Sequence, residues 1–145
     1  QMTGMNFLNF YPKLFARIKS ERPDSLQKVH PIHGDITTEN ICVNPEDAET
    51  LINSVNIILH CAATIKFDLT LKDAVRSNVT GTKNVIHFAR RVKNLKSFVH
   101  VSTAFSNCYS KNIEERVYPT KIDPLNVVNM TEWMPQDVLQ SVAPM

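Results

Sequence analysis

The chain has 145 residues, of which 43% are hydrophobic and 21% charged, and its formal net charge is +2. These values are typical of a globular domain with one core, and the weak, scattered charge excludes a basic stripe for nucleic acid. No apolar run approaches the roughly 18 residues of a membrane span, and three widely spaced cysteines form no disulfide framework, which favours a reducing compartment.

The predicted elements alternate between helix and strand. In chain order they are a helix over 6–18, a strand over 28–33, a helix over 45–53, a strand over 55–60, a helix over 71–92, a strand over 97–101 and short helices near 124–129 and 135–142. The helices are predicted from apolar residues every three to four positions. The strands at 55–60 and 97–101 are short apolar runs typical of strands buried on both faces. This alternation predicts an α/β fold with a parallel sheet covered on both faces.

Ligands of such sheets bind beyond the carboxyl ends of the strands. At the first strand end, Asp35 and Ile36 can hold an adenine ring between polar groups and an apolar side chain, although Asp35 can equally cap a turn. At the second, Ala62 and Ala63 leave the backbone open to a ribose or pyrophosphate, although small residues also permit tight packing of a helix on the sheet. Neither site decides the function alone.

Hydroxyl and amide side chains follow the third strand and interrupt the long helix. Ser102 and Thr103 can donate to a substrate carbonyl, although they are equally frequent in turns. Asn78 and Gly81 lie within the predicted helix, where a glycine costs up to about 1 kcal/mol. We expect that cost to be offset because Gly81 lets the helix approach a strand and Asn78 holds a water or main-chain group near a cofactor.

Taken in order, these segments resemble the extended short-chain dehydrogenase/reductase superfamily, and within it the fatty acyl-CoA reductases. The similar segments are "HCAATIKFD", "NVTGTKNV", "KSFVHVSTAFSN" and "IEERVYP", within a match that runs from about residue 10 to residue 123. The resemblance implies a Rossmann domain that binds NADPH, followed by a substrate-binding portion. It also implies reduction of a long-chain acyl-CoA to a fatty alcohol.

The resemblance also implies roles for individual residues. Thr103 would be the catalytic hydroxyl, and the cofactor-binding residues would be Asp35 and Ile36 at the adenine, Cys61, Ala62 and Ala63 at the ribose-phosphate portion, Asn78 from the helix and Ser102 at the nicotinamide. No metal is expected, because His60, His87 and His100 lack the spacing of a ligand set.

Three features of the family are missing. Gly4, Gly34 and Gly81 cannot form a glycine-rich turn, no Tyr-x-x-x-Lys pair occurs, and Phe105 stands where the family usually has tyrosine. We therefore expect an internal fragment that is inactive alone. Its residues 1–123 would be a partial Rossmann-like, doubly wound sheet lacking the first strands, and residues 124–145 the start of the substrate-binding region.

Two alternative functions remain open from the sequence. One is another extended short-chain enzyme that acts on sterols or nucleotide sugars, and the other is a non-catalytic nucleotide-binding module. The resemblance favours an intracellular enzyme on the cytosolic face of the endoplasmic reticulum or peroxisome. It would be attached through a segment beyond Met145, with long-chain acyl-CoA as its partner and no nucleic acid.

Overall fold

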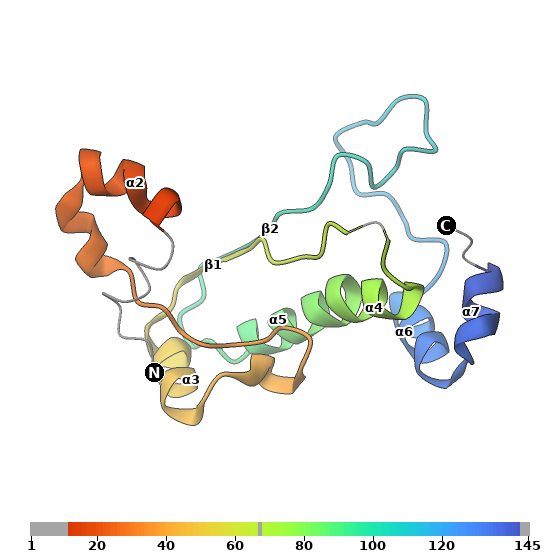
Figure 1. The fold of residues 1–145 in the computed structure, drawn as a ribbon, viewed down its shortest axis with the longest axis horizontal. Helices are drawn as coiled ribbons and strands as arrows, with labels where there is room; N and C mark the ends of the chain where they lie inside the picture. The colour runs from red at the N-terminus through yellow and green to blue at the C-terminus, as the bar shows by residue number, and fades with distance from the viewer. Residues whose placement is uncertain (1–11, 67, 143–145) are drawn as a thin grey trace. The chain divides into compact units, whose positions relative to one another are not determined.

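The computed structural model describes residues 12–66 and 68–142. The chain divides into two compact units, residues 1–33 and residues 34–145, and Figure 1 shows the elements of each. No helix in the described ranges is long and apolar enough to cross a membrane.

The first unit contains α2 (Pro12–Glu21) and the 3-10 helix η1 (Pro23–Lys28). The helix predicted over residues 6–18 is confirmed from Pro12 onward, and its earlier residues lie outside the described range. Proline is favoured in the first helical turn because its missing N–H has no helical partner there. Phe15 is the buried residue of this helix.

The strand predicted over residues 28–33 is wrong. After η1 the chain is extended at Val29, with φ −95° and ψ 114°, but residues 29–33 form no strand. The described sheet consists of two strands, neither of which is this segment. An extended segment becomes a strand only when a neighbour completes its backbone hydrogen bonds, and the described residues supply none.

The second unit contains the remaining described elements. They are η2 (Glu39–Cys42), α3 (Pro45–Ser54), β1 (Ile57–His60), α4 (Leu71–Val75), η3 (Arg76–Thr80), α5 (Gly81–Ala89), β2 (Ser97–His100), α6 (Pro124–Trp133) and α7 (Gln136–Val142). Side-chain oxygens of Asn44, Thr70 and Asp123 accept first-turn backbone N–H groups and so begin α3, α4 and α6. The helices predicted near residues 45, 71, 124 and 135 are therefore confirmed.

The strands β1 and β2 are parallel, with Ile57 opposite Ser97 and His60 opposite His100. The run of α4, η3 and α5 connects them, as expected for a βαβ unit, and lies along one side of the sheet (Figure 1). His60 faces this helical layer and is only 4% exposed.

The other face of the sheet is open. Ile57 is 57% exposed and Leu59 is 67% exposed, and Val99 and Val101 are also exposed. Alternate residues of a strand point to opposite faces, so these four side chains share the face turned away from the helix. The prediction of burial on both faces is wrong for the described residues, because the described helices of the second unit cover one face of the sheet alone.

The long connecting helix changes its geometry in the middle. Residues 76–80 form a π-helical turn between α4 and α5, and the helix ends at Ala89 rather than near residue 92. A Cβ on Gly81 would lie 2.9 Å from Ile36 Cδ1. Gly81 therefore permits close approach to the segment after residue 34, not to a strand as expected.

The two C-terminal helices belong to the second unit. Both α6 and α7 contact α4, and they bury Val128, Thr131 and Leu139. The domain boundary expected after residue 123 stays a prediction.

Candidate functional site

The carboxyl ends of β1 and β2 lie side by side. The ladder continues one step past the strands, where the Val101 N–H donates to the His60 carbonyl oxygen at 2.9 Å. Residues 61–63 and residues 102–103 therefore leave the sheet at the same edge. Both segments are exposed, so the fold brings together two of the three predicted strand ends with their backbones accessible.

Asn78 holds the segment that follows β1. Its Oδ1 accepts the Thr64 N–H at 2.9 Å, and its Nδ2 donates to the Thr64 carbonyl oxygen at 3.1 Å. One amide thus satisfies both backbone groups of one residue. The prediction that Asn78 holds a main-chain group is confirmed.

His60 is linked to the same helix through Thr82. The Thr82 hydroxyl donates its single proton to the Asn78 carbonyl oxygen at 2.7 Å, while His60 Nε2 lies 3.2 Å from Thr82 Oγ1. Because that proton is already used, Thr82 must accept, so His60 carries a proton on Nε2. The His60 ring also stacks on His100, with the ring centroids 5.1 Å apart.

Burial lowers the pKa of His60 below its ordinary value of 6.5, and the neighbouring His100 lowers the pKa further. The unfolded chain therefore takes up a proton at this residue more readily than the folded chain as the pH falls. The contribution of His60 to stability is fully present above pH 6.5 and is lost as the pH falls through its folded pKa.

We expect a His60→Gln variant to lose less stability than the wild type below pH 6.5. Glutamine does not titrate, and its Nε2 can still donate to Thr82. Urea unfolding followed by circular dichroism at several pH values measures this. Parallel pH profiles for the two proteins would contradict the expectation.

The first predicted strand end is built around Asp35. Its Oδ1 accepts both the backbone N–H and the hydroxyl of Thr37, each at 2.8 Å. Asp35 thus caps a turn, which is the alternative that the sequence left open. Asn84 Nδ2 donates to the carbonyl oxygens of Ile36 and Thr38 at 2.9 and 3.0 Å, so the turn is tied to α5.

The third strand end folds into a local turn. Thr103 Oγ1 accepts the Phe105 N–H at 3.2 Å, and Ser102 Oγ lies 3.3 Å from Ser106 Oγ. Ser102 and Thr103 are both exposed. Thr103 acts only as an acceptor toward Phe105, so this bond does not use its hydroxyl proton.

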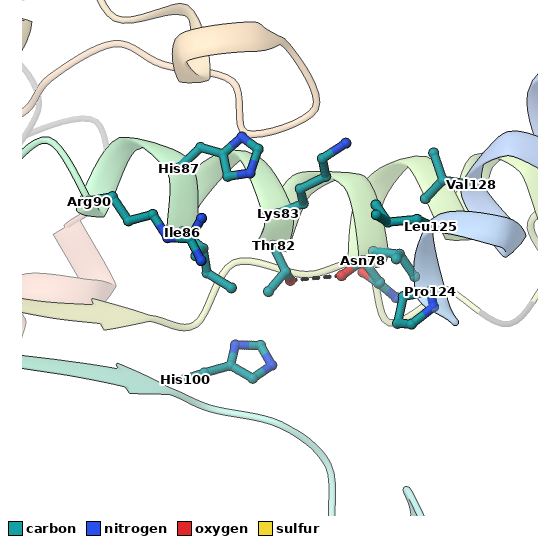
Figure 2. A pocket seen from close by; sticks show the side chains of 11 residues that line it. Asn78, Thr82, Lys83, Ile86, His87, Arg90, His100, Pro124, Leu125 and Val128 are labelled. Atoms are coloured by element: carbon teal, nitrogen blue, oxygen red, sulfur yellow. Dashed lines mark hydrogen bonds between the residues drawn. The ribbon is translucent and has the colours of Figure 1, made fainter. Parts of the chain in front are cut away.

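A cavity of about 430 Å³ lies beside these strand ends (Figure 2). It is lined by Asn78, Val79, Thr82, Lys83, Ile86, His87, Arg90, His100, Pro124, Leu125 and Val128. In Figure 2, Thr82 and Ile86 point toward His100, whereas Lys83 and His87 point away from it. The cationic groups of the cavity therefore do not converge on one point. Of the predicted site residues, Asn78 alone lines it.

Residues 78–84 of the helical run contact two of the segments that carry predicted site residues. Asn78 contacts the segment after β1, while Gly81 and Asn84 contact the segment around Ile36. Thr82 and Asn84 were missed by sequence reasoning. The available signal was spacing, since Thr82 is one helical turn after Asn78. Within the described residues, no group of three or more His, Cys, Asp or Glu side chains is placed to hold a metal.

An NAD-binding family model described as "Male sterility protein" matches residues 10–141. The chain is 42% identical over 132 residues to fatty acyl-CoA reductase 1 of Homo sapiens and 40% identical to that of Xenopus laevis. It is 36% identical over 132 residues to fatty acyl-CoA reductase 2 of Mus musculus. Each match covers 91% of this chain and 26% of the relative. The chain therefore spans about a quarter of the length of these curated relatives.

Proposed function

Because the chain belongs to the NAD-binding male sterility protein family, which includes the fatty acyl-CoA reductases, we propose that it forms part of the NADPH site of an enzyme that reduces long-chain acyl-CoA to fatty alcohol. Family membership confirms the resemblance drawn from the four sequence segments. It also supports a nicotinamide cofactor. The choice of NADPH over NADH, the acyl-CoA substrate and the alcohol product belong to the proposal.

The observation that carries the proposal is the sheet edge where residues 61–63 and 102–103 emerge together. Dinucleotides bind parallel sheets at such an edge. Ala62 and Ala63 place no bulky side chain there, and Asn78 holds the backbone just beyond them. A flat polar ligand can therefore approach main-chain atoms at this point.

The proposed roles follow from this placement and from the resemblance. Cys61, Ala62 and Ala63 lie against the ribose-phosphate portion, and Ser102 and Thr103 face the nicotinamide and the acyl carbonyl. By the resemblance, the turn at residues 35–36, which Asn84 ties to α5, frames the adenine. The Thr103 hydroxyl accepts the Phe105 N–H, which does not use its own proton, so it would donate that proton to the carbonyl oxygen as hydride is added.

The open face of the sheet indicates that further structure covers it in the complete fold. Ile57, Leu59, Val99 and Val101 present an apolar surface that water would contact in this chain alone. We propose that the relatives' additional length supplies the remaining strands and a second helical layer over this face, which completes a doubly wound sheet. The glycine-rich turn and the Tyr-x-x-x-Lys pair would belong to that additional length, as would attachment to the endoplasmic reticulum or peroxisome.

The full-length protein tests this function directly. With palmitoyl-CoA and NADPH we expect a fatty alcohol by gas chromatography, and no product when either reactant is omitted. NADH in place of NADPH tests the cofactor. Oxidation of NADPH by a keto form of a sterol or of a nucleotide sugar, without aldehyde or alcohol from palmitoyl-CoA, would instead support another short-chain enzyme. Binding of NADPH without turnover of any of these substrates would support a non-catalytic module.

A further inference from the structure

Side chains on one turn of helix form hydrogen bonds with both ends of the segment that follows β1. His60, the last residue of the strand, is bonded to Thr82, and Thr64 is bonded twice to Asn78. Residues 61–63 lie between these two points. Their backbone path is thus set by two side chains that stand four residues apart on the helix.

Thr82 links the hydrogen bond at His60 to the two hydrogen bonds at Thr64. Its hydroxyl donates to the Asn78 carbonyl oxygen at 2.7 Å and accepts from His60 Nε2. Asn78 belongs to the π-helical turn, and π turns are frequent at functional sites. A threonine hydroxyl that bonds a carbonyl four residues earlier bends a helix locally. The bond from Thr82 therefore bears on the orientation of the residue that holds Thr64.

The stacked histidines extend this connection to the second strand. His60 rests on His100 of β2 and on Thr82 of α5, and it is 4% exposed. A ring fixed on two sides has few alternative orientations. The start of residues 61–63 is therefore held with respect to both the helix and the neighbouring strand.

We propose that Thr82 is a positioning residue that holds residues 61–64 in the conformation that receives the cofactor. This inference rests on the proposed function, because it assigns that segment to the NADPH site. Thr82 acts through His60 and Asn78 and contacts neither cofactor nor substrate. The role depends on the hydroxyl, which donates to the Asn78 carbonyl oxygen and accepts from His60 Nε2.

A Thr82→Val variant keeps the shape of the side chain and removes both hydrogen bonds. In the cofactor-free chain we expect the Thr64 N–H to exchange with solvent about three- to tenfold faster than in the wild type, since one or two lost bonds weaken the grip. Thr82→Ser restores the hydroxyl and should return exchange to the wild-type rate. Thr80→Val is the matched control, because Thr80 lies in the same helix and is half-buried.

The full-length protein gives the second measurement. NADPH fluorescence titration should show a dissociation constant raised about three- to tenfold by Thr82→Val and restored by Thr82→Ser. The KM for acyl-CoA and the kcat at saturating NADPH should each change by less than about threefold. A loss confined to cofactor affinity distinguishes positioning of this segment from general destabilisation.

The outcomes separate this inference from the proposed function. If the wild type binds NADPH and Thr82→Val changes neither Thr64 exchange nor NADPH affinity, the role of Thr82 is overturned. Equal effects of Thr80→Val and Thr82→Val overturn it as well. A wild type that binds no NADPH, with Thr64 still protected through Thr82, overturns the proposed function and the cofactor role together.

Discussion

Replacing Asn78 with alanine is expected to weaken NADPH binding by the full-length protein roughly five- to thirtyfold. The substitution removes both hydrogen bonds to Thr64, and each is worth about 0.5–1.5 kcal/mol. Because Asn78 is exposed, water replaces part of that loss, so the lower half of the summed range applies. Titration of NADPH fluorescence measures the change.

Two further variants test whether the effect comes from the Asn78 amide itself. Asn129→Ala removes an exposed asparagine from α6 and should leave the dissociation constant unchanged. Asn78→Asp keeps an acceptor for the Thr64 N–H but turns a second oxygen toward the Thr64 carbonyl oxygen, now without a donor. We expect it to bind NADPH no better than Asn78→Ala. Wild-type affinity in Asn78→Ala would show that the hydrogen bonds to Thr64 do not contribute to NADPH binding.

Gly34→Ala should destabilise the chain by about 1–3 kcal/mol, the usual cost of overpacking. Its Cβ would lie 2.9 Å from the Ile41 carbonyl oxygen and 3.3 Å from Val43 Cγ2. That carbonyl already accepts the Asp35 N–H at 2.7 Å, and Ile41 has a left-handed φ of 52°. A backbone oxygen held in this way cannot yield without breaking a hydrogen bond.

Gly81→Ala provides the matched comparison within the same chain. Its Cβ would approach Ile36 Cδ1 to 2.9 Å and Ile36 Cγ1 to 3.1 Å, but both atoms belong to one side chain that can shift. Alanine also favours a helix over glycine by up to about 1 kcal/mol. Urea unfolding should therefore show a near-neutral Gly81→Ala beside a destabilised Gly34→Ala, and the reverse order would refute this account of the two contacts.

Local signals in the sequence predicted the helices well. Asn44 and Thr70 cap α3 and α4, and Pro45 and Pro124 lie in first turns, so these boundaries depend on residues close in the chain. The parallel pairing of β1 with β2 also followed from the order of elements. Such features need no knowledge of distant contacts.

Features that depend on distant partners were predicted poorly. Residues 29–33 have the composition of a strand but no described strand to pair with. The run that forms β1 is apolar on both faces, yet Ile57 and Leu59 are exposed because no described helix covers them. Both predictions were wrong because composition does not reveal whether a neighbouring strand or helix is present.

The site shows the same division. Asn78 was expected to hold a main-chain group, because an asparagine within a helix needs a reason, but Thr64 as its partner emerged only from the fold. Thr82 was missed, since its role depends on His60 arriving opposite it from a strand 22 residues away.

The sequence by itself determined the family, the alternation of helix and strand, and the places where the helices begin. These properties follow from motifs, periodicity and caps, whose interactions span a few residues. The tertiary structure decided which backbone groups the helix holds, which face of the sheet stays open and how Thr82 connects His60 to Asn78. Hydrogen bonds and burial depend on what lies within a few ångströms in space, and local composition does not specify those neighbours.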